Sequence, residues 1–106
     1  METILFDWDV ENIRHLAKHD ILPEEAEQVL KNQPCDLESE LRNGEERVAL
    51  IGETDAGRIL IVISTMQDQR VRVVTAWPAK ERLRRYFQIQ KRNGYVGKIE
   101  KHDLRE

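Results

Sequence analysis

The sequence has a single cysteine, and it lacks any apolar run long enough to cross a membrane. Because Cys35 has no partner in the chain, an internal disulfide and a thiolate metal cluster are both excluded. A membrane-spanning helix needs about 18 or more apolar residues, whereas the longest apolar run here is Ile59–Ile63. The opening METILFDWD is acidic and does not have the basic start and apolar stretch of a signal peptide. We therefore expect a cytoplasmic protein without a membrane partner.

Motifs of several catalytic classes are also missing. The chain has no GxSxG elbow and no phosphate-binding P-loop, and no neighbouring residues suggest that Cys35 is an activated nucleophile. His15 and His19 are four residues apart, which can present two imidazoles to one ion. Two ligands are too few for a zinc site, and the HExxH pattern is absent. We expect no metal site and no cofactor, and we interpret this histidine pair as part of a solvated helix face.

Charge is distributed unevenly along the 106 residues. Residues 1–40 hold 3 Lys or Arg against 11 Asp or Glu, whereas residues 41–106 hold 14 against 9. Basic residues are densest over Arg70–Arg92, where only Glu81 opposes them. Such a split is typical of a protein that binds a polyanion with one face. The alternative is that the two halves neutralise each other through weak surface ion pairs.

Hydrophobic spacing predicts two helices near the N-terminus. The first is expected over Val10–His19, with the Asp9 side chain as its N-cap. Its buried face is predicted to contain Val10, Ile13, Leu16 and Ala17. Its opposite face is predicted to contain Asn12, His15 and His19. The second helix is expected to begin at Pro23, which suits a first helical turn, and to end before Pro34.

The rest of the chain reads as a sheet followed by a helix. Strands are expected over residues 36–41, 47–54, 58–66 and 70–77, with residues 3–8 as a further short candidate. Residues 58–66 are apolar on both faces, which places that strand inside the sheet. Short connections imply antiparallel neighbours. A last helix follows Pro78 over residues 79–92 and ends at Asn93–Gly94. The prediction is an α+β fold with helices on a small antiparallel sheet, a C-terminal helix, and a tail over residues 93–106.

The basic region combines cations with aromatic side chains. RNA is bound through its phosphates and through bases that stack on aromatic or guanidinium planes. Trp77 and Tyr86 would supply stacking surfaces beside the arginines. Two alternatives stay open: Trp77 can be a plug over the corner of the sheet, and Tyr86 can be ordinary core packing. The arginines of this region are Arg58, Arg70, Arg72, Arg82, Arg84 and Arg85.

Three segments together resemble the BrnT toxin family, a branch of the RelE-type ribonuclease toxins. FDWDVENIRHLAKHDILPEEAEQVL is similar to the opening of that family, and ALIGETDAGRILIVIS is similar to its Gly-x-Thr-x-x-Gly-Arg hairpin. RVRVVTAW is similar to the strand that usually reads Arg-Ile-Ile-Ser-Ala-Arg. The resemblance covers about residues 5–92, and it identifies residues 1–92 as one BrnT-like domain.

The resemblance implies a RelE-like fold and a metal-independent endoribonuclease that cleaves RNA and inhibits translation. It also implies a BrnA-like antitoxin as partner, with operator DNA bound only through the toxin–antitoxin complex. Trp77 stands where the family strand has its second arginine, and the Glu81–Arg82 pattern is out of step with the family helix. The alternative is therefore a catalytically weak homologue that binds the antitoxin and serves as a transcriptional co-repressor module.

The expected catalytic residues are Arg58, Arg72, His19 and Lys18. The two arginines would hold the scissile phosphate, because arginine stays protonated and serves as a clamp. His19 or Lys18 would transfer the proton, and histidine titrates nearest to neutrality. This prediction requires the guanidinium groups to converge on one pocket.

Further RNA contacts are expected on both sides of Pro78. The RNA-binding residues predicted there are Arg70, Trp77, Lys80, Arg82 and Tyr86. Lys80 and Arg82 would hold a flanking phosphate.

Overall fold

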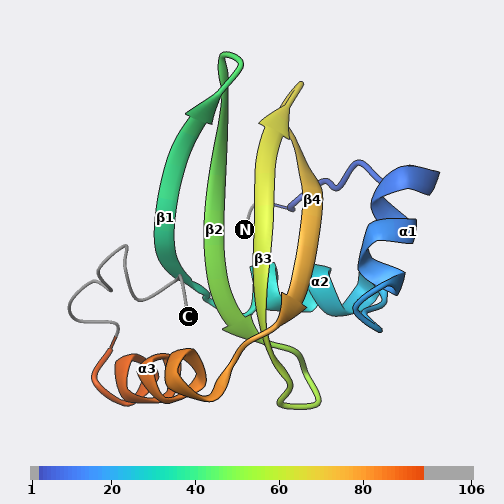
Figure 1. The fold of residues 1–106 in the computed structure, drawn as a ribbon. Coiled ribbons are helices and arrows are strands. Elements are labelled where there is room, and N and C mark those ends of the chain that lie inside the picture. The colour runs from blue at the N-terminus through green and yellow to red at the C-terminus, as the bar shows by residue number, and fades with distance from the viewer. Residues whose placement is uncertain (1–2, 95–106) are drawn as a thin grey trace.

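The computed structural model describes residues 3–94 and shows one four-stranded antiparallel sheet with three helices (Figure 1). The strands lie in chain order, β1-β2-β3-β4. Their bounds are β1 (Cys35–Arg42), β2 (Glu45–Glu53), β3 (Ile59–Gln67) and β4 (Arg70–Pro78). The helices are α1 (Val10–Ala17), α2 (Pro23–Lys31) and α3 (Glu81–Arg92). The predicted α+β class, with an antiparallel sheet and a C-terminal helix, is confirmed.

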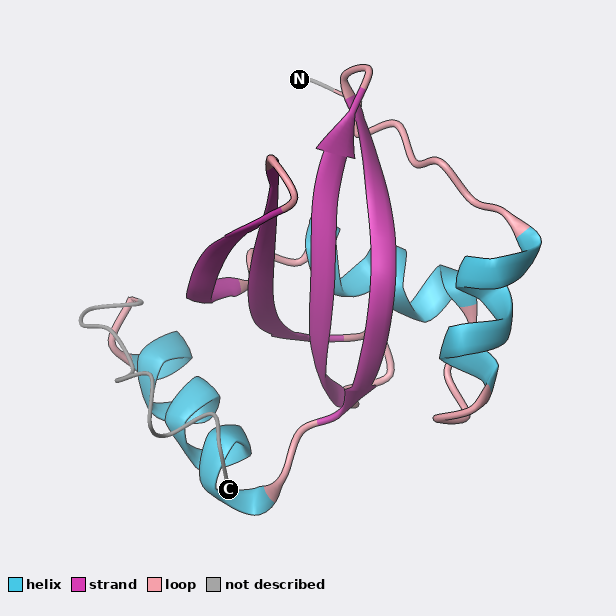
Figure 2. Cartoon of the chain, turned by 45° about the horizontal axis from the view of Figure 1, so that its top comes forward, coloured by secondary structure: helices cyan, strands magenta, loops and turns pink. Residues whose placement is uncertain are grey.

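Helices cover both faces of the sheet, with α1 and α2 on one face and α3 on the other (Figure 2). Strand β3 supplies both cores because its side chains alternate. Ile59 and Ile61 pack toward α3, in one cluster with Phe87. Leu60 and Val62 pack toward α1 and α2. The apolar composition of β3 on both faces is thus explained by its place between two cores.

The outer edge of β4 is paired over a short length by the N-terminal segment. The Val71 amide donates to the Leu5 carbonyl at 2.8 Å, and the Asp7 amide donates to the Val71 carbonyl at 2.9 Å. These bonds form an isolated parallel bridge between Phe6 and Val71. The strand candidate at residues 3–8 is therefore only this single bridge.

The predicted buried face of the first helix is wrong in part. Leu16 is buried as predicted, but Val10 and Ile13 are 67% and 42% exposed and Ala17 is exposed as well. Asn12, predicted on the opposite face, is buried. The cause is the anchoring of the helix start: Asp9 caps α1 and also binds Arg72 of β4. This contact fixes the rotation of the helix so that Asn12 and Leu16 are buried. The helix also ends early, at Ala17.

The C-terminal boundary of α3 is as predicted. Asn93 is the C-cap, and Gly94 has a φ of +74°, in the left-handed region that glycine adopts without strain. Tyr95 and the rest of the predicted tail lie outside the described residues. The division into a domain over residues 1–92 and a tail therefore stays a prediction.

Candidate nucleic-acid interface

Arg58 lies at the end of the tight connection between β2 and β3. Thr54 builds that connection: its hydroxyl accepts from the Arg58 amide at 3.0 Å, and its amide donates to the Arg58 carbonyl at 2.8 Å. Gly57 completes the turn with a φ of +87°. The Gly-x-Thr-x-x-Gly-Arg pattern therefore has a structural role at this turn.

The Arg58 guanidinium is held by α2 and by the loop before it. Its Nη1 donates to both carboxylate oxygens of Glu25 at 3.0 Å and to the Asp20 carbonyl at 2.9 Å. Burial alone would raise the pKa of Glu25, but the Leu22 amide and Arg58 outweigh it and hold that pKa below its usual value. The Arg58 side chain is still 34% exposed, so it remains accessible to a ligand.

Arg72 is held by carboxylates of the N-terminal segment. Its Nη2 lies 2.6 Å from Asp9 Oδ2, and its Nη1 lies 3.7 Å from Asp7 Oδ2. The Asn12 amide and the Arg72 guanidinium together hold the pKa of Asp9 below its usual value. Arg72 thus connects β4 to the start of α1.

Arg58 and Arg72 do not converge, which contradicts the prediction that they share one phosphate. Arg72 pairs in register with Thr65, seven residues along β3 from Arg58. At about 3.3 Å per residue, that separation is about 23 Å. Charge-assisted hydrogen bonds are about 2.7–2.9 Å long, so one phosphate cannot contact both groups. Both arginines also form ion pairs with carboxylates from two segments of the acidic half. The alternative that the two halves neutralise each other through ion pairs therefore holds for these two residues.

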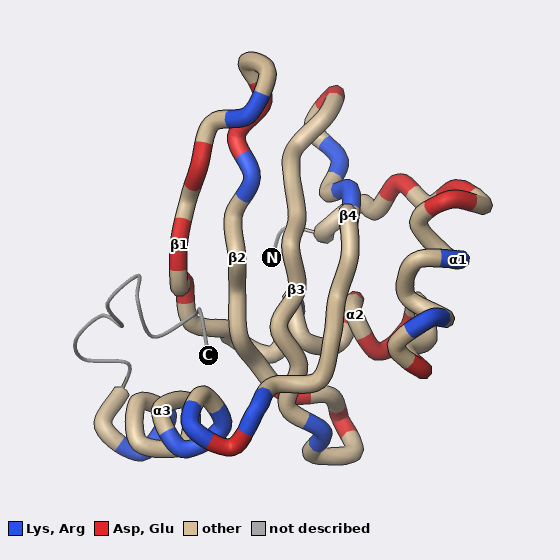
Figure 3. Tube along the Cα trace, viewed as in Figure 1, with Lys and Arg blue, Asp and Glu red and all other residues tan. Residues whose placement is uncertain are grey.

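Other predicted residues lie around the end of the sheet where β3 begins and β4 ends, on its two faces. Because Arg58 contacts the Asp20 carbonyl, the exposed side chains of Lys18 and His19 lie in the loop next to it. The Ala79 amide donates to the Ile59 carbonyl at 3.0 Å, which sets Lys80 beside Arg58. We call this group, Lys18, His19, Arg58, Lys80 and Arg82, the β4–α3 corner. Figure 3 shows cations along α3 and in the segment that joins it to β4.

Arg82 is exposed in the first turn of α3. A cation there is opposed by the helix dipole, typically by about 0.3–1 kcal/mol. Arg84 folds back, and its Nη1 donates to the Ala79 carbonyl at 3.3 Å. Arg82 therefore adds positive charge at the corner, and Arg84 adds it next to the corner.

The aromatic residues are half-buried. Trp77 pairs in register with Ile61 and packs, like Tyr86, against the core under α3. Both therefore have the packing role that the sequence left open, and each keeps some exposed surface. Arg70 is exposed at the far end of β4, opposite Gln67. It lies apart from the corner.

Sequence reasoning missed the carboxylates that hold the arginines. Glu25, Asp7 and Asp9 were seen only as part of an acidic half or as helix caps. Glu27 was also missed; its Oε2 accepts from the Trp8 indole at 2.7 Å. The acidic–basic asymmetry was a signal for such pairs, but it does not say which residues meet.

The remaining reactive group is Cys35, which is buried. Burial raises the pKa of its thiol to about 11, so it is not a thiolate at neutral pH. Over residues 3–94, no three His, Cys, Asp or Glu side chains are grouped so that they could hold a metal ion. In the same range, none of the helices has the length and apolar character that a membrane span requires.

The fold and this charge distribution define a small α+β domain with a basic corner and an acidic N-terminal half. The family of ribonuclease toxins, BrnT, of type II toxin–antitoxin systems matches residues 8–82. Because the match covers well over half of the chain, the protein belongs to the BrnT family, as the resemblance indicated. This family implies an antitoxin partner and an RNA target. No curated protein matches the chain.

Proposed function

We propose that this protein is a metal-independent endoribonuclease that binds RNA at the β4–α3 corner and inhibits translation by cleaving it. The proposal rests on one observation: three separate segments supply cations around one end of the sheet, with α1 and α3 on its opposite faces. The cations come from the end of α1, the β2–β3 connection and the start of α3. Preorganised cations of this kind stabilise the charge that develops on a phosphate.

The chemistry requires little from the protein. The 2′-oxygen of the substrate attacks the neighbouring phosphorus, the bond to the 5′-oxygen breaks, and a 2′,3′-cyclic phosphate forms. His19 would take the proton of the 2′-hydroxyl or return one to the 5′-oxygen, a contribution of about 10²–10⁴ in rate. Arg58, oriented by Glu25, would bind the scissile phosphate, and Lys80 with Arg82 would bind a flanking one. Arg72 is assigned a structural role in this proposal.

The test uses purified protein and RNA in excess chelator between pH 6 and pH 8. We expect His19→Gln to lower the cleavage rate at least tenfold, because the proposed proton-transfer group is lost. The double variant Lys80→Ala/Arg82→Ala should weaken RNA binding at least fivefold. Its control, Arg42→Ala/Arg70→Ala, removes as many cations from exposed positions at the far end of the sheet. Intact RNA with the wild-type protein would contradict the proposal.

A second candidate is supported by the carboxylates around Arg58 and Arg72. Both guanidinium groups are already paired, and Trp77 replaces an arginine of the family strand. A chain of this kind can bind a BrnA-like antitoxin and strengthen its repression without cleaving RNA. Promoter binding by the complex but not by the isolated chain, together with intact RNA, would favour this candidate.

A further inference from the structure

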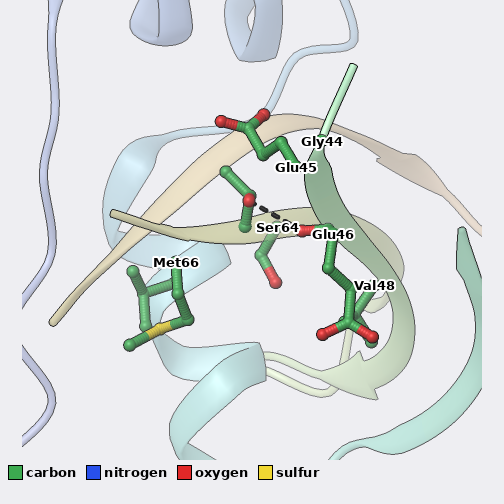
Figure 4. A pocket seen from close by; sticks show the side chains of 8 residues that line it. Gly44, Glu45, Glu46, Val48, Ser64 and Met66 are labelled. Atoms are coloured by element: carbon green, nitrogen blue, oxygen red, sulfur yellow. Dashed lines mark hydrogen bonds between the residues drawn. The ribbon is translucent and has the colours of Figure 1, made fainter. Parts of the chain in front are cut away.

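Helix α2 covers only one end of strands β2 and β3 on its side of the sheet. It packs over the end of β2, where Val29 and Pro34 lie close to Gly52. At the other end of the strands, next to the β1–β2 turn, the same face opens into a hollow of about 340 Å³. Figure 4 shows Glu46 and Val48 of β2 beside it, together with Ser64 and Met66 of β3.

The floor of the hollow is apolar and accessible. Val48 pairs with Ser64, and Met66 pairs with Val71, so these four side chains share one face of the sheet. Met66 is 60% exposed. Contiguous apolar surface on a central strand costs solubility, so it marks an interaction site more often than an isolated exposed side chain does. Methionine also adapts its shape to a partner.

The rim of the hollow is acidic. Glu45 and Glu46 line it, and a second hollow of about 420 Å³ adjoins it along β1, sharing Glu46 and Val48. Asp36 and Glu38 line that second hollow. Among the residues that line the two hollows, none is Lys or Arg, although Arg47 lies nearby, with its Nε 3.5 Å from Glu45 Oε1. Phosphates would be repelled here, so RNA is not a suitable occupant.

The acids of β1 have another explanation, since charges on an edge strand oppose edge-to-edge aggregation. That explanation does not extend to β2 and β3, which are inner strands. Protection of an edge strand therefore does not explain why Val48 and Met66 are exposed together beside Glu46.

We propose that the paired hollows bind a basic amphipathic segment of the antitoxin. Its apolar side would cover Val48 and Met66, and its Lys or Arg side chains would reach Glu45, Glu46 and Glu38. The inference rests on family membership for the existence of an antitoxin and deepens the proposed function by locating its docking surface. The surface is distinct from the β4–α3 corner: Met66 lies seven residues along β3 from Ile59, about 23 Å away.

The test variant is Glu46→Lys/Met66→Lys. The control, Glu40→Lys/Val10→Lys, makes the same charge changes at two exposed positions outside the hollows. Glu40 lies on the opposite face of the sheet, in register with Arg47. Both proteins are compared with wild type by thermal unfolding and then titrated with the purified antitoxin encoded beside the toxin gene. We expect at least tenfold weaker antitoxin binding by the test variant and less than a twofold change for the control.

The milder Glu46→Gln, which is uncharged and similar in shape, should weaken antitoxin binding two- to fivefold. This single variant keeps the test valid if the double variant misfolds.

RNA cleavage by the test variant should equal that of wild type, so that it becomes a toxin that the antitoxin cannot neutralise. If wild type cleaves no RNA while the binding losses occur, the docking surface stands and the proposed activity fails. Equal antitoxin affinity of test and control variants would overturn the inference. So would a test variant that loses self-association instead, because the hollow would then bind a second copy of the chain.

Discussion

The contact between Arg58 and Glu25 offers the most direct check of how the site is held. Replacing Arg58 with Met removes the guanidinium but keeps most of the apolar stem. Three hydrogen bonds are lost, two to the Glu25 carboxylate and one to the Asp20 carbonyl. Hydrogen bonds to charged groups contribute about 1.5–3 kcal/mol, whereas exposed ion pairs contribute about 0.2–1 kcal/mol.

The exposed fractions decide between these ranges. The side chains of Arg58 and Glu25 are 34% and 21% exposed, so solvent screens the pair in part. We expect a coupling energy of about 1 kcal/mol between them and a total loss of roughly 2 kcal/mol for Arg58→Met. For a domain of this size, the loss corresponds to a Tm lower by about 8–16 °C.

The assay is a double-mutant cycle with Arg58→Met, Glu25→Gln and the double variant, measured by urea unfolding at pH 7. Nearby residues that interact show non-additivity above about 0.5 kcal/mol. A coupling energy below that limit would refute the structural role of the pair. RNA cleavage by each variant, measured well below its Tm, then separates stability from chemistry. Glu25→Gln keeps the guanidinium, so it should retain more activity than Arg58→Met.

Three further predictions concern the rest of the molecule. Gly52→Ala should destabilise the fold by about 1–3 kcal/mol, because the added Cβ would lie 3.0 Å from Val29; an unchanged free energy of unfolding would contradict this reason. The lowered pKa of Glu25 contributes stability above its unfolded pKa of about 4, which is lost as the pH falls through the folded value. Glu25→Gln should therefore be less stable than wild type at pH 7 but equally stable at pH 2–3 in urea unfolding, and an unchanged gap would exclude this linkage. Alkylation of Cys35 should be slow in the folded protein and fast in urea, since burial raises its pKa to about 11; rapid native labelling would show that the thiol is accessible.

The order of the elements could be predicted from the sequence because local patterns encode it. Asp9, Pro23 and Gly94 mark helix boundaries through short-range backbone chemistry, and the structure has the boundaries there. The two-faced strand was recognisable from its apolar run. The rotation of α1 was not predictable, because it depends on a contact between Asp9 and a residue 63 positions away. Helical periodicity alone cannot weigh such a contact.

The site was predicted less well, for a related reason. Charge counts indicated a basic region over Arg70–Arg92. Two residues of the β4–α3 corner, Lys80 and Arg82, belong to that region. Charge counts could not show that Arg58 and Arg72 face different carboxylates at opposite ends of the sheet, since that depends on strand register. The neutralising pairs are present at Arg58 and Arg72, and Lys80 and Arg82 remain the cations of this region that we propose for RNA binding.

Residues that hold the fold and residues proposed for chemistry differ in how well they tolerate replacement. Thr54, Gly57 and Arg58 form the β2–β3 turn and hold α2, so their replacement costs stability whether or not RNA is cleaved. His19 is exposed and lies outside every helix and strand, so His19→Gln should leave stability within about 0.5 kcal/mol of wild type. A loss of cleavage in this variant would therefore reflect lost chemistry and not lost stability. His19→Gln is therefore the variant that separates the two proposed roles most cleanly, because only the proposed ribonuclease uses His19.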